Sequence, residues 1–224
     1  MCFRIVLIGR KKAGKSSLLA TLRARRPVLI AIGKRTRVVD VKTLELSDED
    51  FLEVYDQGGH AVYGITSNLF ICRKCTVLLV QEVTDPDDMT EMISRLRQIL
   101  HRHPDVKIHT VLTHTDKLDT ASVNGNSEKI MEKLNEILKQ EIENAEKYNT
   151  HSGEGQQDHL VNERAVCYPE KLMKIKNDMQ LFCVSSHNFD GMIKVIEFLH
   201  QVAKEGTVNI PDPWAKLFVL ISVS

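Results

Sequence analysis

The stretch that decides the fold is Gly9-Arg-Lys-Lys-Ala-Gly14-Lys15-Ser16, which fits the pattern GxxxxGK[ST]. It follows the apolar, strand-like run Phe3–Ile8 and opens a helical pattern. This is the context that the pattern requires, because successive backbone N–H groups form an anion nest at a positive helix N-terminus. The sequence therefore predicts a phosphate-binding loop, built from Gly9, Lys12, Ala13, Gly14, Lys15, Ser16 and Ser17.

Two further roles follow from the chemistry of this loop. Lys15 is expected to reach the β- and γ-phosphates of a nucleotide, and the Ser16 hydroxyl is expected to ligate Mg²⁺. The motif DQGGH begins at Asp56, directly after the predicted strand Phe51–Tyr55. A carboxylate at a strand end can hold Mg²⁺ through water, and Gly59 lets a backbone N–H approach the γ-phosphate. Lys15 and Gly59 are thus candidate catalytic residues.

Thr36 and His60 are two further candidate site residues, and each also has a simple structural explanation. Thr36 lies 20 residues after Ser16 and 20 before Asp56. A threonine there could close on Mg²⁺ as a third ligand, although it could also simply start a strand, and Thr43 competes for the role. His60 stands where a neutral imidazole could orient an attacking water, or it could be a solvated loop histidine.

A base-reading site is predicted at the ends of two later strands. Thr113-His114-Thr115-Asp116 ends the strand-like run Val106–Leu112. A carboxylate at Asp116 can accept from guanine N1–H and the 2-amino group together, an arrangement that adenine does not offer. Its alternative role is that of a helix-capping residue. The predicted guanine-binding residues are Thr113, His114, Asp116, Ser185, Ser186 and His187, the last three following the run Leu181–Val184.

The strand-like runs alternate with helical patterns along the chain, which predicts right-handed crossovers and an α/β fold. We expect three layers, with a mostly parallel six-stranded sheet flanked by helices. A helical and polar insertion is expected at about 120–178, with Ser127 capping a helix that runs to about Tyr148. We expect one domain over 1–208, followed by a linker and apolar tail over 209–224. The expected strands are Phe3–Ile8, Arg37–Leu46, Phe51–Tyr55, Thr76–Val80, Val106–Leu112 and Leu181–Val184.

The amino-acid composition excludes several kinds of protein. The 224 residues carry 30 basic and 30 acidic side chains, so a whole-domain footprint for nucleic acid is not expected. Five cysteines are an odd and sparse count for a disulfide framework, which suggests a reducing compartment. No apolar run approaches 18 residues, so no transmembrane segment is expected. We therefore expect a cytoplasmic protein.

The order of these motifs resembles a Ras-like P-loop GTPase, and within that class a Roc (Ras of complex proteins) domain. The resemblance covers about residues 3–214. Its more specific parts are the THTD motif ending at Asp116, the stretch Thr36-Arg-Val-Val-Asp-Val41, and Ile210-Pro-Asp-Pro-Trp214, which is similar to the linker into a COR domain. The resemblance implies binding of GTP and GDP with Mg²⁺, slow hydrolysis, protein effectors or regulators, and often a homodimer.

The chain also departs from the family pattern. Lys11 and Lys12 stand where Ras-like proteins often have glycine, and they could either crowd the site or assist phosphate binding. His60 replaces a glutamine, and His187 replaces a lysine that usually lies near the base. No COR domain follows the linker, so we expect a truncated or alternatively spliced product, or a lone domain.

Two function hypotheses follow. The favoured one is a guanine-nucleotide switch with Mg²⁺-dependent GTP binding and slow hydrolysis. The other is a catalytically inactive P-loop interaction module that binds partners through the insertion helix and the tail. An ATP-using small-molecule kinase is disfavoured by Asp116 and by the DxxGG motif.

Overall fold

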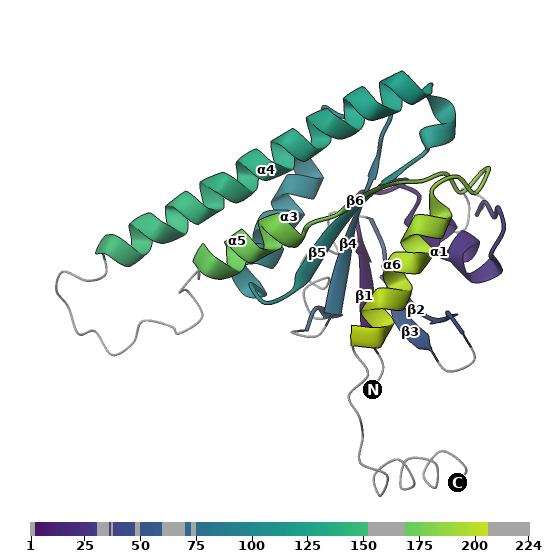
Figure 1. Cartoon of the computed structure of the whole chain (residues 1–224), viewed down its shortest axis with the longest axis horizontal. Coiled ribbons are helices and arrows are strands. Elements are labelled where there is room, and N and C mark those ends of the chain that lie inside the picture. The colour runs from purple at the N-terminus through teal and green to yellow at the C-terminus, as the bar shows by residue number, and fades with distance from the viewer. Residues whose placement is uncertain are drawn as a thin grey trace, which may run out of the picture.

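The computed structural model describes residues 3–30, 36, 38–47, 50–59, 70–72, 75–151 and 169–205. Within them, six strands form one sheet in the order β2-β3-β1-β4-β5-β6 (Figure 1). Only the β2–β3 pairing is antiparallel among these strands, which confirms the mostly parallel six-stranded sheet. The strands are β1 (Phe3–Ile8), β2 (Val39–Glu45), β3 (Phe51–Gln57), β4 (Cys75–Glu82), β5 (Lys107–Thr113) and β6 (Leu181–Cys183).

Helices cover both faces of this sheet (Figure 1). On one face, α1 (Lys15–Ala24) and α6 (Met192–Glu205) pack over Ile5 and Leu7 of β1. On the other face, the next side chains along β1 pack into a core shared with α3 (Thr90–Arg102), α4 (Thr120–His151) and α5 (Pro169–Asp178). Because both faces are buried, the central strands are continuous apolar runs. The site loops follow the carboxyl ends of the parallel strands, along one edge of the sheet.

The long helix α4 begins earlier than the sequence predicts. Ser127 does not cap it: this residue is buried inside the helix and donates its hydroxyl hydrogen to the Asn124 carbonyl oxygen at 2.8 Å. Asp119 lies at the start instead, where hydrogen bonds from Ser122 lower the pKa of its carboxyl group. The residues before Ser127 carry little apolar periodicity, so the hydrophobic pattern did not reveal the true start.

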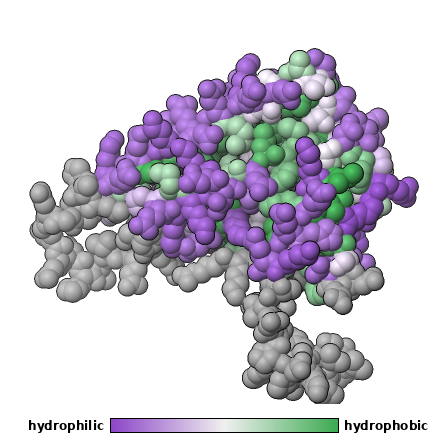
Figure 2. All heavy atoms as spheres, in the orientation of Figure 1, coloured by the Kyte–Doolittle hydropathy of each residue, from purple (hydrophilic) through white to green (hydrophobic). Residues whose placement is uncertain are grey.

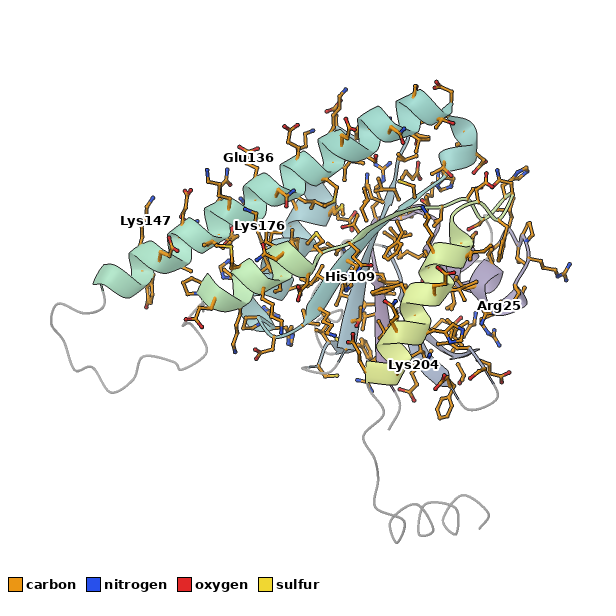
Figure 3. The ribbon with its side chains drawn as sticks, viewed as in Figure 1. Arg25, His109, Glu136, Lys147, Lys176 and Lys204 are labelled. Carbon is orange, nitrogen blue, oxygen red and sulfur yellow. The ribbon has the colours of Figure 1, made fainter. Side chains whose placement is uncertain are left out.

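The predicted apolar stripe of α4 is confirmed. Its outer residues Glu136 and Lys147 point away from the sheet (Figure 3). The surface over α4 is mostly hydrophilic (Figure 2). Helix α5, which the pattern did not locate, packs on α4 through Leu172 and Ile175. The predicted linker and tail over 209–224 lie outside the described residues. The buried residues of the stripe are Ile130, Leu134, Leu138 and Ile142, with Ile137 partly buried beside them.

Among the helices that the structure describes, none has both the length and the apolar character needed to cross a bilayer.

Candidate functional site

The loop between β1 and α1 has a backbone suited to an anion. Lys12 and Gly14 both adopt left-handed conformations, with φ of 69° and 80°. Gly14 is also the N-cap of α1, and no side chain caps the helix there. A side chain at this position would be strained by its positive φ. The N-terminus of α1 is therefore left for backbone N–H groups to bind a ligand.

Lys15 is buried at the start of α1 and is held by the same loop. Its Nζ donates to the carbonyl oxygens of Gly9 at 2.7 Å and Arg10 at 2.8 Å. Burial lowers the pKa of Lys15 to about 8, and the nearby Asp56 carboxylate opposes this shift. An anion beside the ammonium group would restore the charge that burial disfavours, so the geometry suits a phosphate.

Three oxygen-bearing side chains converge beside this lysine. The Ser16 hydroxyl donates to Asp56 Oδ2 at 2.5 Å, and the Thr36 hydroxyl donates to the same atom at 3.0 Å. The two hydroxyl oxygens lie 3.1 Å apart. Burial raises the pKa of Asp56, while these two hydrogen bonds lower it. Asp56 itself is the penultimate residue of β3, rather than the residue that follows the strand.

This arrangement fits a divalent cation. Asp56 Oδ1 is buried and has no hydrogen-bond partner among the described residues. A buried carboxylate oxygen without a partner is costly, and a hard cation would satisfy it. Hydroxyl and carboxylate oxygens are also the ligand types that Mg²⁺ prefers. Thr36 and Ser16 thus lie together at Asp56, whereas Thr43 lies on β2, where it pairs with Glu53.

Gly59 brings the end of β3 against the phosphate-binding loop. A Cβ atom at this position would lie 2.4 Å from the Lys11 nitrogen and 2.5 Å from the Arg10 carbonyl carbon. Only glycine permits so close an approach of two backbones. The neighbouring Gly58 is fixed by its N–H, which donates to the Val38 carbonyl oxygen at 2.9 Å. His60, the candidate for orienting water, lies outside the described residues.

Asp116 and Ser185 come together from two different strand ends. Asp116 lies in the short 3₁₀ helix η3 (Thr115–Lys117), and its Oδ1 accepts a hydrogen bond of 2.6 Å from the buried Ser185 hydroxyl. The Ser185 oxygen also accepts from the backbone N–H groups of His187 at 3.1 Å and Asn188 at 3.4 Å. Asp116 is therefore oriented by one carboxylate oxygen, which leaves the other oxygen for a ligand.

Thr113 and His114 both lie beside the phosphate-binding loop, with side-chain atoms close to Gly14. The buried Thr113 hydroxyl hydrogen-bonds to the Ala13 carbonyl oxygen at 2.9 Å and the Gln81 carbonyl oxygen at 3.2 Å. Thr113 therefore ties β5 to the phosphate-binding loop. His114 adopts φ of 63°, and its Nδ1 lies 3.0 Å from the Thr113 hydroxyl. Burial, assisted by Lys117, lowers the pKa of His114 and favours a neutral ring.

The remaining predicted residues take varied positions. Lys12 is exposed on the loop, whereas Ala13 is buried. The Ser17 hydroxyl accepts from the Ile30 N–H at 3.3 Å, which anchors the segment after α1. Ser186 is buried and His187 is exposed beside it.

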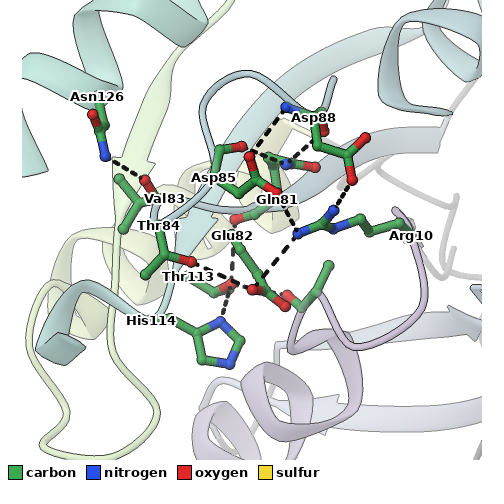
Figure 4. Close-up of polar contacts among 11 residues, drawn as sticks. Arg10, Gln81, Glu82, Val83, Thr84, Asp85, Asp88, Thr113, His114 and Asn126 are labelled. Carbon is green, nitrogen blue, oxygen red and sulfur yellow. Dashed lines mark hydrogen bonds and ion pairs between the residues drawn. The ribbon is translucent and has the colours of Figure 1, made fainter. Parts of the chain in front are cut away.

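One residue of the loop was missed by sequence reasoning. The Arg10 side chain makes ion pairs with three carboxylates: Glu82 at the end of β4, and Asp85 and Asp88 in the segment that follows (Figure 4). The motif treats this position as variable, so the only available signal was the acidic run Asp85-Pro-Asp-Asp88.

The fold and the phosphate-binding loop define a P-loop nucleotide-binding protein. A family model described as the ADP-ribosylation factor family matches residues 1–163, and the chain belongs to this family. Its members are small GTPases, so the chain is a GTP-binding molecular switch and a GTP-hydrolysing P-loop enzyme. Membership in this family supports the hypothesis of a guanine-nucleotide switch over the hypothesis of a catalytically inactive interaction module. A search of curated proteins finds no significant sequence match.

Solved structures share the fold at low identity. A bacterial selenocysteine-specific elongation factor matches with a TM-score of 0.61 and 18% identity, over 94% of this chain and 30% of that one. Roco2 RocCORdC from Methanosarcina barkeri, bound to GDP, matches with a TM-score of 0.53 and 14% identity, over 90% of this chain and 49% of that one. The chain thus spans less than half of these two proteins. The Arl6 (BBS3) small GTPase from Trypanosoma brucei, with GppNp bound, matches with a TM-score of 0.59 and 14% identity, over 92% of this chain and 100% of that one.

Proposed function

We propose that the nucleotide binds with its phosphates on the 9–17 loop and its guanine base against Asp116, with Mg²⁺ held by Ser16, Thr36 and Asp56. The observation that carries this proposal is the convergence of the Ser16 and Thr36 hydroxyls on one Asp56 oxygen, across 40 and 20 residues of sequence. The hydrogen bond from Ser185 to Asp116 supports the base-binding part.

Each of the proposed site residues has its own role in GTP hydrolysis. Lys15 and the loop N–H groups hold the β- and γ-phosphates and stabilise the negative charge of the transition state. Ser16, Thr36 and Asp56 would hold Mg²⁺, which would supply further positive charge at the same phosphates. Gly59 keeps the end of β3 close to the phosphate-binding loop. Its backbone N–H would thereby approach the γ-phosphate of a bound GTP. Turnover is expected to be slow because no arginine in the described part of the chain is assigned to the transferring phosphoryl group.

Replacing Lys15 with Ala tests the phosphate-binding part. The loss of a buried ammonium held by Gly9 and Arg10 should abolish tight binding of fluorescent GDP and GTP. Lys139→Ala is a matched control, because Lys139 is exposed on α4 and its nearest carboxylate, Glu143, lies 3.9 Å away. Unchanged affinity in the Lys15 variant would refute the assignment.

The water-orienting role is proposed for His60 or for a partner protein. A single-turnover measurement on preloaded GTP compares the wild type with His60→Ala. A large fall in rate with unchanged GTP affinity supports His60, whereas an unchanged rate assigns the role elsewhere.

We also propose the finer Roc-type assignment, a homodimer and a cytoplasmic location. The THTD motif ending at Asp116 and the Pro/Trp stretch Ile210–Trp214 support the Roc type. Light scattering with GDP and with a GTP analogue tests the dimer, and a monomeric mass with both would refute it. Cell fractionation tests the location.

A further inference from the structure

Arg10 connects the phosphate-binding loop to the segment between β4 and α3. Its Nη2 lies 3.7 Å from Glu82 Oε2 and 3.6 Å from Asp85 Oδ2, and its Nη1 contacts Asp88 Oδ2 (Figure 4). The arginine side chain is only 20% exposed, whereas Asp85 and Asp88 are about half exposed. The ion pairs are therefore partly shielded from solvent, which strengthens them relative to fully exposed pairs.

The segment that carries Asp85 and Asp88 is itself held by hydrogen bonds. The buried Gln81 side chain donates to the carbonyl oxygens of Asp85 at 3.4 Å and Asp88 at 3.1 Å. The Asp88 N–H donates to Asp85 Oδ1 at 3.3 Å. These hydrogen bonds tie the acidic segment to the end of β4.

The backbone of Arg10 lies at the centre of the proposed phosphate site. Its carbonyl oxygen accepts the 2.8 Å hydrogen bond from Lys15 Nζ. Gly59 packs so closely on the same peptide that a Cβ there would lie 2.6 Å from the Arg10 carbonyl oxygen. Any shift of Arg10 would therefore move an acceptor of Lys15 and a contact surface of Gly59 together.

We propose that Arg10 is a positioning residue for nucleotide binding: its ion pairs with Glu82, Asp85 and Asp88 fix the peptide carbonyl that orients Lys15 toward the phosphates. This inference rests on the proposed function. It gives the acidic side chains of Glu82, Asp85 and Asp88 a part in positioning the phosphate site. Loss of the ion pairs is expected to weaken GDP binding by about tenfold, since each partly exposed pair contributes modestly.

Two kinds of variant separate positioning from plain electrostatics. Arg10→Ala removes the anchor together with a positive charge, so both explanations expect weaker binding. The double variant Asp85→Asn/Asp88→Asn leaves Arg10 in place and makes the region near the phosphates more positive. Electrostatics alone then expects tighter GDP binding, whereas positioning expects weaker binding. Arg4→Ala is a matched control, since Arg4 lies at the opposite end of β1 and pairs with Glu53 at 3.7 Å.

The measurements are the dissociation constant of fluorescent GDP and the unfolding midpoint without nucleotide. The proposal expects the double variant to bind GDP about tenfold more weakly, with an unfolding midpoint close to that of Arg4→Ala. Tighter or unchanged binding by the double variant would overturn it, as would a loss of affinity that merely follows a loss of stability. Failure of the wild type to bind guanine nucleotide would instead remove the proposed function, and the inference with it.

Discussion

Exchanging Asp116 for Asn should change the base that the protein accepts. An asparagine presents an amide donor where aspartate presents a second acceptor, so guanine loses the partner for its N1–H and 2-amino donors. Xanthine carries a carbonyl oxygen in place of the 2-amino group and matches the amide donor better. The Asp116→Asn variant is therefore expected to lose affinity for GDP and to gain affinity for xanthosine diphosphate.

The magnitude follows from the surroundings of Asp116. Its Oδ1 is held at 2.6 Å by Ser185, and an asparagine oxygen could keep that contact and present its nitrogen to the base. A fully buried polar site rejects a mismatched ligand by about 10⁴- to 10⁵-fold. Asp116 is exposed, so solvent partly compensates for lost hydrogen bonds. We expect a loss of GDP affinity of about 10²- to 10⁴-fold.

The assay is competition of fluorescent GDP with unlabelled GDP and xanthosine diphosphate, on wild type and variant. Asp105→Asn is the control, since Asp105 pairs with Lys171 at 2.6 Å, away from the strand ends that bear the site. Wild-type GDP affinity in Asp116→Asn would refute the base-reading role. Equal loss of both nucleotides would point to a damaged loop rather than to a specificity switch.

Three further outcomes are expected. Gly59→Ala should lower the affinity for a non-hydrolysable GTP analogue about tenfold or more relative to the affinity for GDP, because the new Cβ would lie 2.4 Å from the Lys11 nitrogen. Equal affinities of the variant for the two nucleotides in titrations would contradict this. Chelation of Mg²⁺ by EDTA should accelerate GDP release from the wild type, whereas the release rate of Ser16→Ala should not respond to EDTA. An EDTA response in the variant would argue against Ser16 as a Mg²⁺ ligand. Burial, assisted by Lys107, lowers the pKa of His109 from 6.5 to about 4, so the unfolded chain binds the extra proton and stability falls as pH drops from 6.5 toward 4. The loss should reach about 3 kcal/mol in denaturant unfolding, and His109→Gln should show a shallower pH dependence; an unchanged slope would contradict this.

The central strand β4 could be predicted because burial on both faces makes it largely an apolar run, whereas β2 was predicted from its alternating pattern. The run Thr76–Val80 is entirely apolar after its first residue, and in the structure it lies within the longer strand β4 (Cys75–Glu82). The predicted ends of helices were less accurate where a helix begins with polar residues, as at the start of α4. Helix α5 was not located because only Leu172 and Ile175 of its ten residues are buried hydrophobic residues.

The candidate site was predictable where its chemistry lies in local motifs. Lys15 and Ser16 follow from the loop pattern, and Thr36 followed from spacing alone. The ion pairs of Arg10 were not predictable, because their partners lie 72 to 78 residues away and no pattern links them. The hydrogen bond from Thr113 to Ala13 spans 100 residues and was missed for the same reason.

Equilibrium binding of fluorescent GDP, GTP and ATP to the folded wild-type chain, with and without Mg²⁺, tests the central claim most directly. The account predicts tight binding of GDP and GTP that weakens when Mg²⁺ is removed, with ATP failing to compete. Equal binding of ATP, or no binding by protein whose fold is verified by circular dichroism, would contradict it.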